Sequence, residues 1–405
     1  MSDAAIHDHA SGKGDTADIL IVGCGYVGSR IGVREVTEGA RVIATTRSAA
    51  RFDELTRLGL QPYAIDLGAG PDGRLESLAR GAIVYYLVPP PGAGEQDVHA
   101  RNFLASLGAG RPSVIVLLST TAVYGDCHGA WVNEDTPLNP KTARAHRRCD
   151  GETQFRQWAA QLQVPLAVLR VAGIYGPGRL PKVRLQRGEP VLEPGASPYS
   201  NRIHADDLVR VCRVAARRAK DCRVYNVADG SPSNMCDYFF RVADALGLPR
   251  PPTLSRAQAE QTLSAGMLSY LRESKRIDIT RMREELGVTL RYPDLESGVA
   301  NALGGDGVYV ASPRLVVCIN RRLNDDQPSC AARGSEVLAG RFSEEIARLG
   351  LAAELQRVYC LGRCEHGPNV RIAPGGMAYH GVGEEDIERV IRDLVGVCDA
   401  YASRE

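Results

Sequence analysis

The chain has 405 residues, 44% of them hydrophobic and 24% charged, which is the composition of an ordinary globular protein. Its 49 lysines and arginines nearly balance 48 aspartates and glutamates, so no global charge attracts nucleic acid or an acidic membrane surface. No apolar run approaches the ~20 residues that span a bilayer, and the first sixteen residues lack the apolar core of a secretory signal. We therefore expect a cytoplasmic protein of two or three domains behind a disordered leader over 1–16, with neither nucleic acid nor membrane as partner.

Short apolar segments alternate with helical segments through the first 170 residues. A helix is expected from about residue 26 to residue 38, and the expected strands are 18–23, 41–47, 61–66, 82–88, 113–119 and 166–171. Strands that alternate with helices form βαβ units, whose parallel sheet is covered by helices on both faces. The pattern thus predicts an α/β fold with a doubly wound parallel sheet.

The alternation weakens after Pro181, where we expect a small cap beside the sheet. A glycine-rich segment at 303–307 then marks a hinge, and a new βα…ββα pattern begins at Arg314. These changes divide the chain into a nucleotide-binding domain over 17–302, a linker over 303–312 and a second α/β domain over 313–405.

The motif Gly23-Cys-Gly25-Tyr-Val-Gly28 directly follows the first expected strand and opens a helix. Glycines in this pattern allow a tight turn, close approach of the backbone to a pyrophosphate, and close packing of helix on strand. The helix N-terminus, at Tyr26 and Val27, supplies N–H donors and a favourable dipole for phosphate. The context predicts a dinucleotide site, with a glycine turn that binds nothing as the alternative.

The end of the second strand bears on the choice between NADP and NAD. It reads Thr45-Thr46-Arg47, where an NAD site would place an acid for the ribose 2′-hydroxyl. The planar donor fork of Arg47 suits a 2′-phosphate and favours NADP, whereas the alternative is a solvated arginine. Asp66, at the end of the third strand, is a candidate acceptor for the adenine amino group.

Three later motifs extend this picture: LSTTAVYG at 118–125, GIYGPG at 173–178 and RIHADDL at 202–208. Together with the glycine motif they resemble the extended and atypical short-chain dehydrogenases/reductases, the relatives of the NAD(P)-dependent epimerases and dehydratases. The resemblance covers residues 17 to about 302. It implies an NAD(P)-binding Rossmann domain with a small C-terminal substrate-binding portion.

The resemblance also implies a catalytic Ser or Thr before Val-Tyr-Gly, here Thr120, and a Tyr-x-x-x-Lys pair on the next long helix. Counting back from Glu152, that pair falls on Arg144 and Arg148. Arginine is not deprotonated in proteins and offers no acceptor, so Arg144 cannot act as a base, while Arg148 keeps a donor role toward cofactor ribose or phosphate. His146 lies on a different helix face and is expected to be an exposed polar residue rather than a substitute base.

Two residues of the third motif match positions that line the substrate side of the cleft in this family, namely Arg202 and His204. Arg202 is a candidate to hold an anionic group of a small-molecule substrate that the sequence does not identify. The alternative for Arg202 is a salt bridge to Asp206 or Asp207, and the sequence alone does not decide between the two roles.

Cysteines are concentrated in the second domain. Eleven in all, an odd number without an export signal, argue against a disulfide framework. Gaps of 11, 29 and 3 residues separate Cys318, Cys330, Cys360 and Cys364. The long first gap fits zinc ribbons poorly and a redox C-x-x-C is absent, whereas four thiolates from two loops can hold a [2Fe–2S] cluster.

The surrounding segments, CINRR at 318–322, PSCA at 328–331, CLGRC at 360–364 and Gly367-Pro368, resemble the thioredoxin-like [2Fe–2S] ferredoxins over about 313–397. The resemblance implies that the four cysteines are cluster ligands, with zinc or unliganded thiols as alternatives. The six cysteines of the first domain are expected to be small buried side chains. Cys398 is expected to pack in or near the last helix.

Two interpretations of function follow. The first is an oxidoreductase that couples NADP or NAD to one-electron transfer through the cluster, and it needs a redox partner protein because nicotinamide transfers two electrons as a hydride. The second is a nucleotide-binding regulatory or docking module fused to a ferredoxin, which the missing Tyr and Lys favour. An ordinary epimerase or reductase with a passenger ferredoxin is a third alternative, and a homodimer is a candidate assembly.

Overall fold

The computed structural model describes residues 18–262, 268, 271, 273–304, 313–319, 329–358, 366–373 and 377–402. The predicted leader and residues 305–312 of the predicted linker lie outside these ranges. No helix within the described residues combines the length and the apolar composition that a membrane span requires.

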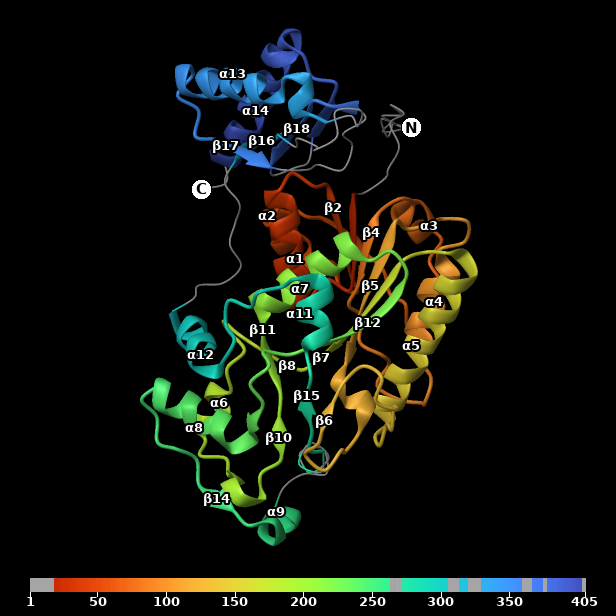
Figure 1. The fold of residues 1–405 in the computed structure, drawn as a ribbon, viewed down its shortest axis with the longest axis vertical. Helices are drawn as coiled ribbons and strands as arrows, with labels where there is room; N and C mark the ends of the chain where they lie inside the picture. The colour runs from red at the N-terminus through yellow and green to blue at the C-terminus, as the bar shows by residue number, and fades with distance from the viewer. Residues whose placement is uncertain are drawn as a thin grey trace, which may run out of the picture.

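A seven-stranded parallel sheet forms the centre of the larger domain (Figure 1). In chain order its strands are β1 (Ile19–Val22), β2 (Val42–Thr46), β3 (Gln61–Ala64), β4 (Ile83–Tyr86), β5 (Val114–Thr120), β7 (Leu166–Val171) and β12 (Cys222–Val227). Their spatial order is β12-β7-β5-β4-β1-β2-β3. The predicted doubly wound sheet is thus confirmed, and its strand order reverses between β1 and β4, where such sheets bind ligands.

Helices cover both faces of this sheet. One face carries α1 (Tyr26–Thr37), α2 (Phe52–Arg57), α7 (Ala205–Arg218) and α11 (Thr280–Leu286), and the other carries α3 (Arg74–Ala79), α4 (Val98–Ser106) and α5 (Ala143–Leu162). Successive side chains of a strand point to opposite faces, and in β1 Ile19 and Ile21 join one core while Leu20 and Val22 join the other. Burial on both faces explains why inner strands such as β1, β5 and β7 read as continuous apolar runs.

A cap of short elements lies beside the sheet (Figure 1). Its helices are α6 (Lys182–Gln186), α8 (Met235–Ala245), α9 (Arg256–Thr262) and α12 (Leu295–Gly304). Its strands pair two by two: β8 (Gly173–Tyr175) with β11 (Arg202–His204), β10 (Tyr199–Ser200) with β13 (Ser233–Asn234), β9 (Val191–Leu192) with β14 (Thr253–Leu254), and β6 (Trp131–Val132) with β15 (Arg276–Ile277). Helix α12 extends two residues past the boundary predicted at 302.

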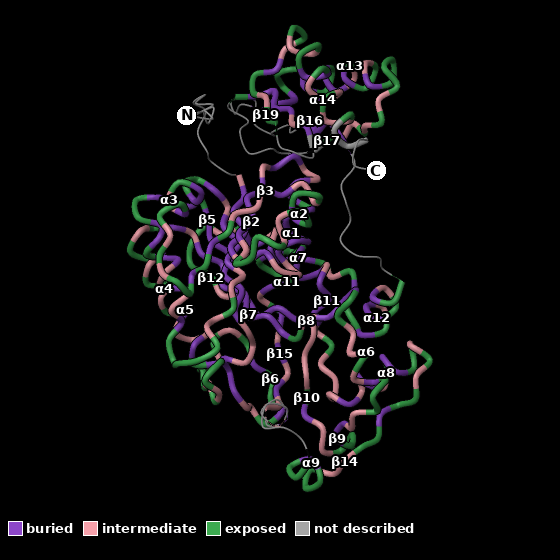
Figure 2. The backbone as a smooth tube through the Cα atoms, turned by 180° about the vertical axis from the view of Figure 1, so that it is seen from behind, coloured by how far each residue is buried: buried purple, intermediate pink, exposed green. Residues whose placement is uncertain are grey.

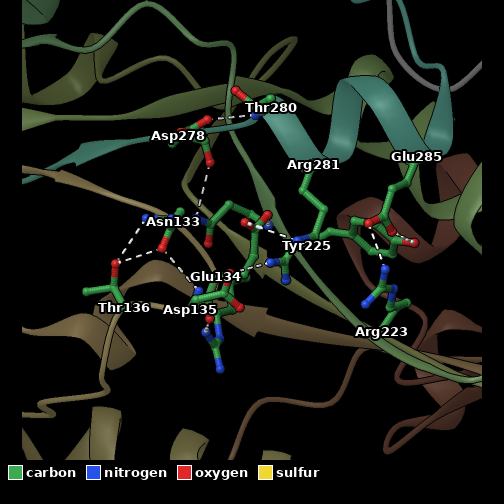
Figure 3. A network of polar contacts seen from close by, with 12 residues as sticks. Asn133, Glu134, Asp135, Thr136, Arg223, Tyr225, Asp278, Thr280, Arg281 and Glu285 are labelled. Carbon is green, nitrogen blue, oxygen red and sulfur yellow. Dashed lines mark hydrogen bonds and ion pairs between the residues drawn. The ribbon is translucent and has the colours of Figure 1, made fainter.

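A polar network joins the loop after β6 to the sheet edge and to α11 (Figure 3). Arg281 lies 2.7 Å from the Asp135 carboxylate and 3.7 Å from that of Glu134. Glu134 in turn accepts a hydrogen bond from the backbone amide of Asn226 on β12 at 2.7 Å, and burial raises the pKa of Glu134. These contacts hold the loop and α11 against the edge strand.

The C-terminal unit is a separate four-stranded mixed sheet with the order β17-β16-β18-β19. Its elements are β16 (Arg314–Cys318), α13 (Ser335–Arg348), β17 (Glu354–Val358), β18 (Asn369–Ala373), β19 (Met377–His380) and α14 (Ile387–Ala402). One sheet face, including Leu315, Val317, Val370 and Ile372, packs with α13 and α14 into its own core, which Figure 2 shows as buried. Cys398 lies in α14 and packs against this core, as predicted.

Candidate functional site

The glycine motif forms the turn from β1 into α1, beside the point where the sheet reverses. Gly23 has a φ of 84°, and a Cβ at this position would lie 2.8 Å from Val88 Cγ2. A Cβ on Gly28 would lie 3.0 Å from Ile21 Cγ2, whereas Gly25 has open space before it. The turn therefore needs glycine at 23 for its backbone and at 28 for the packing of helix on strand.

The first turn of α1 offers backbone donors. Gly25 is its N-cap, and no side chain of the described residues caps it. The amides of Tyr26 and Val27 therefore have the position that binds phosphate at a helix N-terminus. The Tyr26 phenol, by contrast, donates to the Pro177 carbonyl at 2.9 Å, so this side chain connects the glycine turn to the GIYGPG motif at 173–178.

Two arginines lie at the adenosine end. Arg47 is exposed just past β2, and among the described residues it has no hydrogen bond or ion pair. Arg51 donates from Nη1 to the Cys24 carbonyl of the glycine turn at 2.5 Å and pairs with Glu54 at 2.6 Å. Arg51 was not among the predicted residues, because no motif of the sequence marks it.

The other two residues predicted at this end lie just past their strands. Thr46 closes β2, and its hydroxyl accepts from the Ser48 amide at 3.4 Å. Asp66 is exposed two residues beyond β3, where its carboxylate accepts from the Gly68 amide at 2.9 Å. Both side chains are thus used in local turns at the rim of the sheet.

A cavity of about 560 Å³ lies next to the glycine turn. Its walls come from the loop after β4, the end of β5, the start of α5, β8, and the β10–β11 region. The lining residues are Pro89, Pro90, Pro91, Gly92, Thr120, Thr121, Ala122, Arg144, Arg147, Arg148, Ala172, Gly173, Tyr199, Ser200, Asn201, Arg202, Met235, Glu273 and Lys275. The fold thus brings four predicted residues, Thr120, Arg144, Arg148 and Arg202, into one cavity.

The three residues at the family's catalytic positions share one side of this cavity. The Thr120 hydroxyl accepts from the Ala122 amide at 3.3 Å, which fixes its orientation. Arg144 is exposed at the start of α5, and Arg148 is half-buried one turn further on. Arg148 Nη1 donates to the Val88 carbonyl at 3.2 Å, and burial lowers the pKa of Arg148. Because Val88 also contacts Gly23, Arg148 links the cavity to the glycine turn.

Arg202 lies on another wall. Its guanidinium carbon is 3.6 Å from the centre of the Tyr238 ring, and Nη2 donates to the Ser200 hydroxyl at 3.3 Å. Within the described residues, neither Asp206 nor Asp207 forms an ion pair with it. Asp207 accepts instead from two backbone amides, both at 2.8 Å, so the salt-bridge alternative for Arg202 was wrong.

His204 has a different position from the one predicted. It is fully buried and does not line the cavity. Its Nδ1 accepts from the Asp206 amide at 3.2 Å, which caps α7, and its ring centre lies 4.1 Å from that of Tyr292. Burial lowers the pKa of His204. The predicted substrate contact of His204 is therefore corrected to a capping role. The motif implies a position near the cleft, but the side chain is buried and does not reach the cavity.

Lys275 is a cavity residue that the sequence analysis missed. It is buried, and its Nζ donates to the Gly125 carbonyl at 2.6 Å and to the Glu273 carboxylate at 2.8 Å. It comes from the segment before β15, 150 positions after Gly125, so long-range folding alone brings it to the site. No local pattern marked it.

In the C-terminal unit, Cys318 ends β16 and Cys330 lies just before α13. Both are fully buried and contact each other in a cluster apart from the apolar core. Asn369 Nδ2 donates to Cys330 Sγ at 3.5 Å. The other two predicted ligands, Cys360 and Cys364, lie outside the described residues, within which no metal-binding group of three or more side chains occurs.

Comparison with known proteins finds relatives of the larger domain. Residues 90–228 match the model of the NAD dependent epimerase/dehydratase family. Protein YeeZ of Escherichia coli strain K12 is 26% identical over 285 residues, covering 68% of this chain and 96% of YeeZ. A solved structure of a conserved protein of unknown function from Silicibacter pomeroyi has a TM-score of 0.61 and 32% identity, covering 71% of this chain and 98% of that chain.

The same fold occurs in UDP-glucuronic acid 4-epimerase from Bacillus cereus, solved in complex with NAD, with a TM-score of 0.56 and 17% identity over 70% of this chain and 96% of that chain. The doubly wound sheet with a glycine turn at its reversal point defines a Rossmann-type domain. The larger domain thus has the fold of these proteins, and its residues 90–228 carry the match to the NAD-dependent epimerase/dehydratase family. A shorter segment of the chain is 31% identical over 84 residues to a 2Fe-2S ferredoxin of Clostridium pasteurianum, covering 20% of this chain and 82% of the ferredoxin.

Proposed function

We propose that this protein binds NADP(H) in its larger domain, carries a [2Fe–2S] cluster in its C-terminal unit, and acts as a redox protein. The observation that carries the nucleotide part is the glycine turn. It lies where the strand order reverses, with Gly23 at a positive φ and Gly28 packed against β1. Its open side faces the uncapped start of α1, the arrangement that accepts a pyrophosphate.

The choice of NADP over NAD rests on the residues after β2. No acid ends that strand, and Arg47 and Arg51 both lie at the rim of the glycine turn. The guanidinium of Arg47 attracts a 2′-phosphate, while Arg51 is already paired with Glu54; a free 2′-hydroxyl would lack its usual acceptor. Arg148 is the donor we propose for the other end of the nucleotide, because it contacts the Val88 carbonyl beside Gly23.

The cluster is supported by two independent features. Cys318 and Cys330 are fully buried and pack on each other rather than in the apolar core. The ferredoxin similarity and the βα…ββα order of the unit support a thioredoxin-like ferredoxin. We assign Cys360 and Cys364 as the remaining ligands, and the Asn369 amide, which donates to Cys330 Sγ, as a group that tunes the cluster.

The two groups supply different chemistry: the nicotinamide exchanges a hydride and the cluster a single electron. We therefore propose a separate redox partner protein that exchanges two electrons with the nicotinamide and single electrons with the cluster. The chain's own residues position the nucleotide through the glycine turn, and Asn369 and His380, whose Nδ1 lies 2.7 Å from Asn369 Oδ1, orient a donor toward the cysteine sulfur.

Two other functions have specific support. A nucleotide-binding regulatory module is favoured by arginine at both family catalytic positions, since neither Arg144 nor Arg148 can exchange a proton. An ordinary epimerase or reductase is favoured by Thr120, which lines the cavity with its hydroxyl oriented by the Ala122 amide. The redox function is the one in which both the nucleotide and the cluster at the buried cysteine pair take part in the activity.

The cluster is tested by purifying the full chain without oxygen and measuring iron, acid-labile sulfide and the visible spectrum. We expect about two iron and two sulfide per chain, and loss of the colour in Cys330→Ser because an alkoxide is a poorer iron ligand than a thiolate. Cys222→Ser is the matched control, since Cys222 is exposed on β12. Stoichiometric zinc without sulfide would refute the cluster.

A further inference from the structure

The cavity beside the glycine turn is strongly cationic. Among the described residues that line it, the only carboxylate belongs to Glu273, which already pairs with Lys275 at 2.8 Å. Five positively charged side chains line it, namely Arg144, Arg147, Arg148, Arg202 and Lys275. Such an excess of one charge in a concave site raises the local concentration of ligands with the opposite charge.

Three of the arginines form one wall. Arg144, Arg147 and Arg148 are spaced i, i+3 and i+4, so they lie on one side of α5. Arg147 is buried, and its Nη1 donates to the Gly94 carbonyl at 2.5 Å. Its Nε is buried with no hydrogen-bond partner in the described part of the chain. A buried donor without an acceptor is costly, and a bound oxyanion would satisfy it.

Another part of the cavity lining holds Arg202 in a fixed orientation. Its guanidinium stacks on Tyr238, and its Nε is also buried without a hydrogen-bond partner among the described residues. Gly173 makes room for it, because a Cβ there would lie 3.3 Å from Arg202 Nη1. Asp229, whose amide donates to the Arg202 carbonyl at 2.7 Å, is the acidic residue beside it. Burial raises the pKa of Asp229 to about 7, so its charge compensates Arg202 only in part near neutral pH.

We propose that this cavity binds a small ligand with two anionic groups, carboxylate or phosphate, one held by the arginines of α5 and the other by Arg202 and Lys275. Guanidinium groups suit this ligand because their planar donor forks match both oxyanions. The inference deepens the proposed function, on which it rests for the nucleotide beside the cavity. It replaces proton exchange at positions 144 and 148 by charge recognition.

The number of anionic groups is tested with simple probes. Isothermal titration calorimetry on the full chain, with NADP present, compares acetate with malonate, succinate and pyrophosphate. We expect at least one of the three probes with two anionic groups to bind at least ten-fold more tightly than acetate, with an affinity that falls as salt is raised. Equal affinity for acetate and all three of the others would overturn the two-anion site.

Variants locate the binding. Arg144→Gln and Arg202→Gln should each weaken binding of the preferred dianion at least ten-fold. Arg250→Gln is the matched control, because Arg250 is exposed and pairs with Asp244 outside the cavity. Since Arg202 packs on Tyr238, thermal unfolding checks that variant, and Arg144, being exposed, provides a second test that spares the core. Unchanged binding in Arg144→Gln would overturn the proposal.

Failure of the anion site and failure of the proposed nucleotide site give different experimental results. Binding of NADPH, followed by its fluorescence, should be retained in Arg144→Gln and Arg202→Gln. A wild-type protein that binds dianions but not NADPH would refute the nucleotide site and leave the cavity standing. A protein that binds NADPH but none of the dianions would do the reverse.

Discussion

Single side chains at the rim of the glycine turn set the expected cofactor preference. Arg47 has no protein partner among the described residues, whereas Arg51 is anchored to the Cys24 carbonyl and to Glu54. The unpaired charge of Arg47 is thus the one available to a 2′-phosphate. Arg51 shapes the turn on which the phosphate rests.

We predict that Arg47→Asp reverses the preference between NADPH and NADH. An aspartate would repel the 2′-phosphate and accept from a free 2′-hydroxyl, so NADPH binding should weaken at least ten-fold while NADH binding improves. Fluorescence titration of both nucleotides measures this. Arg57→Asp, an exposed position on α2, is the control for net charge. Equal affinities in the wild type that Arg47→Asp leaves unaltered would show that Arg47 plays no part.

Asp229 makes stability depend on pH. It is buried, and this raises its pKa in the folded protein to about 7, above the ~3.9 of an unfolded chain. Between these values the folded state binds more protons, so Asp229 contributes stability at low pH that is lost as the pH rises toward 7, by up to about 4 kcal/mol. The buried, neutral His204 has the opposite effect below its ordinary pKa, so wild type and variant must be compared.

We therefore predict that Asp229→Asn, which has nearly the same shape, loses less thermal stability than the wild type between pH 5 and pH 8. The Ser231 amide, which donates to Asp229 Oδ1 at 2.9 Å, keeps an acceptor in the variant. Melting temperatures at the two pH values are the measurement. Parallel pH profiles for the two proteins would mean that Asp229 is ionised throughout this range.

At the scale of elements, the sequence was most informative where burial is continuous. The apolar runs of β1, β5 and β7 are buried on both faces, and this burial gives short, uninterrupted apolar runs between turn signals, which mark buried strands in the sequence. The two-residue strands of the cap have no such pattern, because their pairing depends on distant partners such as β6 with β15. They were not predicted for that reason.

The candidate site could likewise be predicted where its residues are neighbours in the sequence, but not where folding brings distant residues together. The glycine turn is local, so its chemistry is legible in six residues, while the cavity joins segments as distant as Thr120 and Lys275. His204 was misplaced because a motif does not show whether a side chain faces the cleft or caps a helix. Cys222 was expected to be buried but is exposed, since it starts β12, which lies at the sheet edge.

Helix α5 and the end of β5 determine whether the family's reaction can occur. General acid–base help is worth about 10²–10⁴ in rate and needs a group that changes protonation near the working pH. Arg144 cannot do so, and the Thr120 hydroxyl only orients a carbonyl. We predict little or no dehydrogenase or epimerase turnover, measured as NADPH consumption with carbonyl substrates or as interconversion of UDP-sugars. Rapid turnover that disappears in Thr120→Ala would restore the ordinary enzyme.

At the scale of the whole molecule, the C-terminal unit contacts the larger domain through β18. Arg371 lies 3.3 Å from the Asp18 carboxylate and donates to the Gly39 carbonyl at 3.4 Å. Figures 1 and 2 show this unit beside β2 and α2. Asp18 precedes β1 and Gly23 follows it, so the contact and the glycine turn lie at opposite ends of that strand, roughly 16 Å apart at ~3.3 Å per residue.

This arrangement has a consequence for electron transfer. The contact leaves the cysteine-bearing unit at the end of the sheet away from the glycine turn, so the redox function that we propose needs a separate partner protein between nicotinamide and cluster. The packing at the contact is close, because a Cβ on Gly39, at a φ of 85°, would lie 2.8 Å from Arg371 Cβ. Glycine at position 39 thus permits the positive φ after the end of α1 and leaves room for the close approach of β18.

We predict that Arg371→Glu weakens the contact between the two units without unfolding either. The new carboxylate would face that of Asp18, and like charges at this distance repel, while the bond to the Gly39 carbonyl is lost. Amide hydrogen exchange should rise around residues 39–41 and stay unchanged in α5. Arg389→Glu on α14 is the matched control, because Arg389 pairs with Asp386 inside its own unit. Equal exchange at 39–41 in wild type and Arg371→Glu would show that the two units do not depend on this ion pair to stay together.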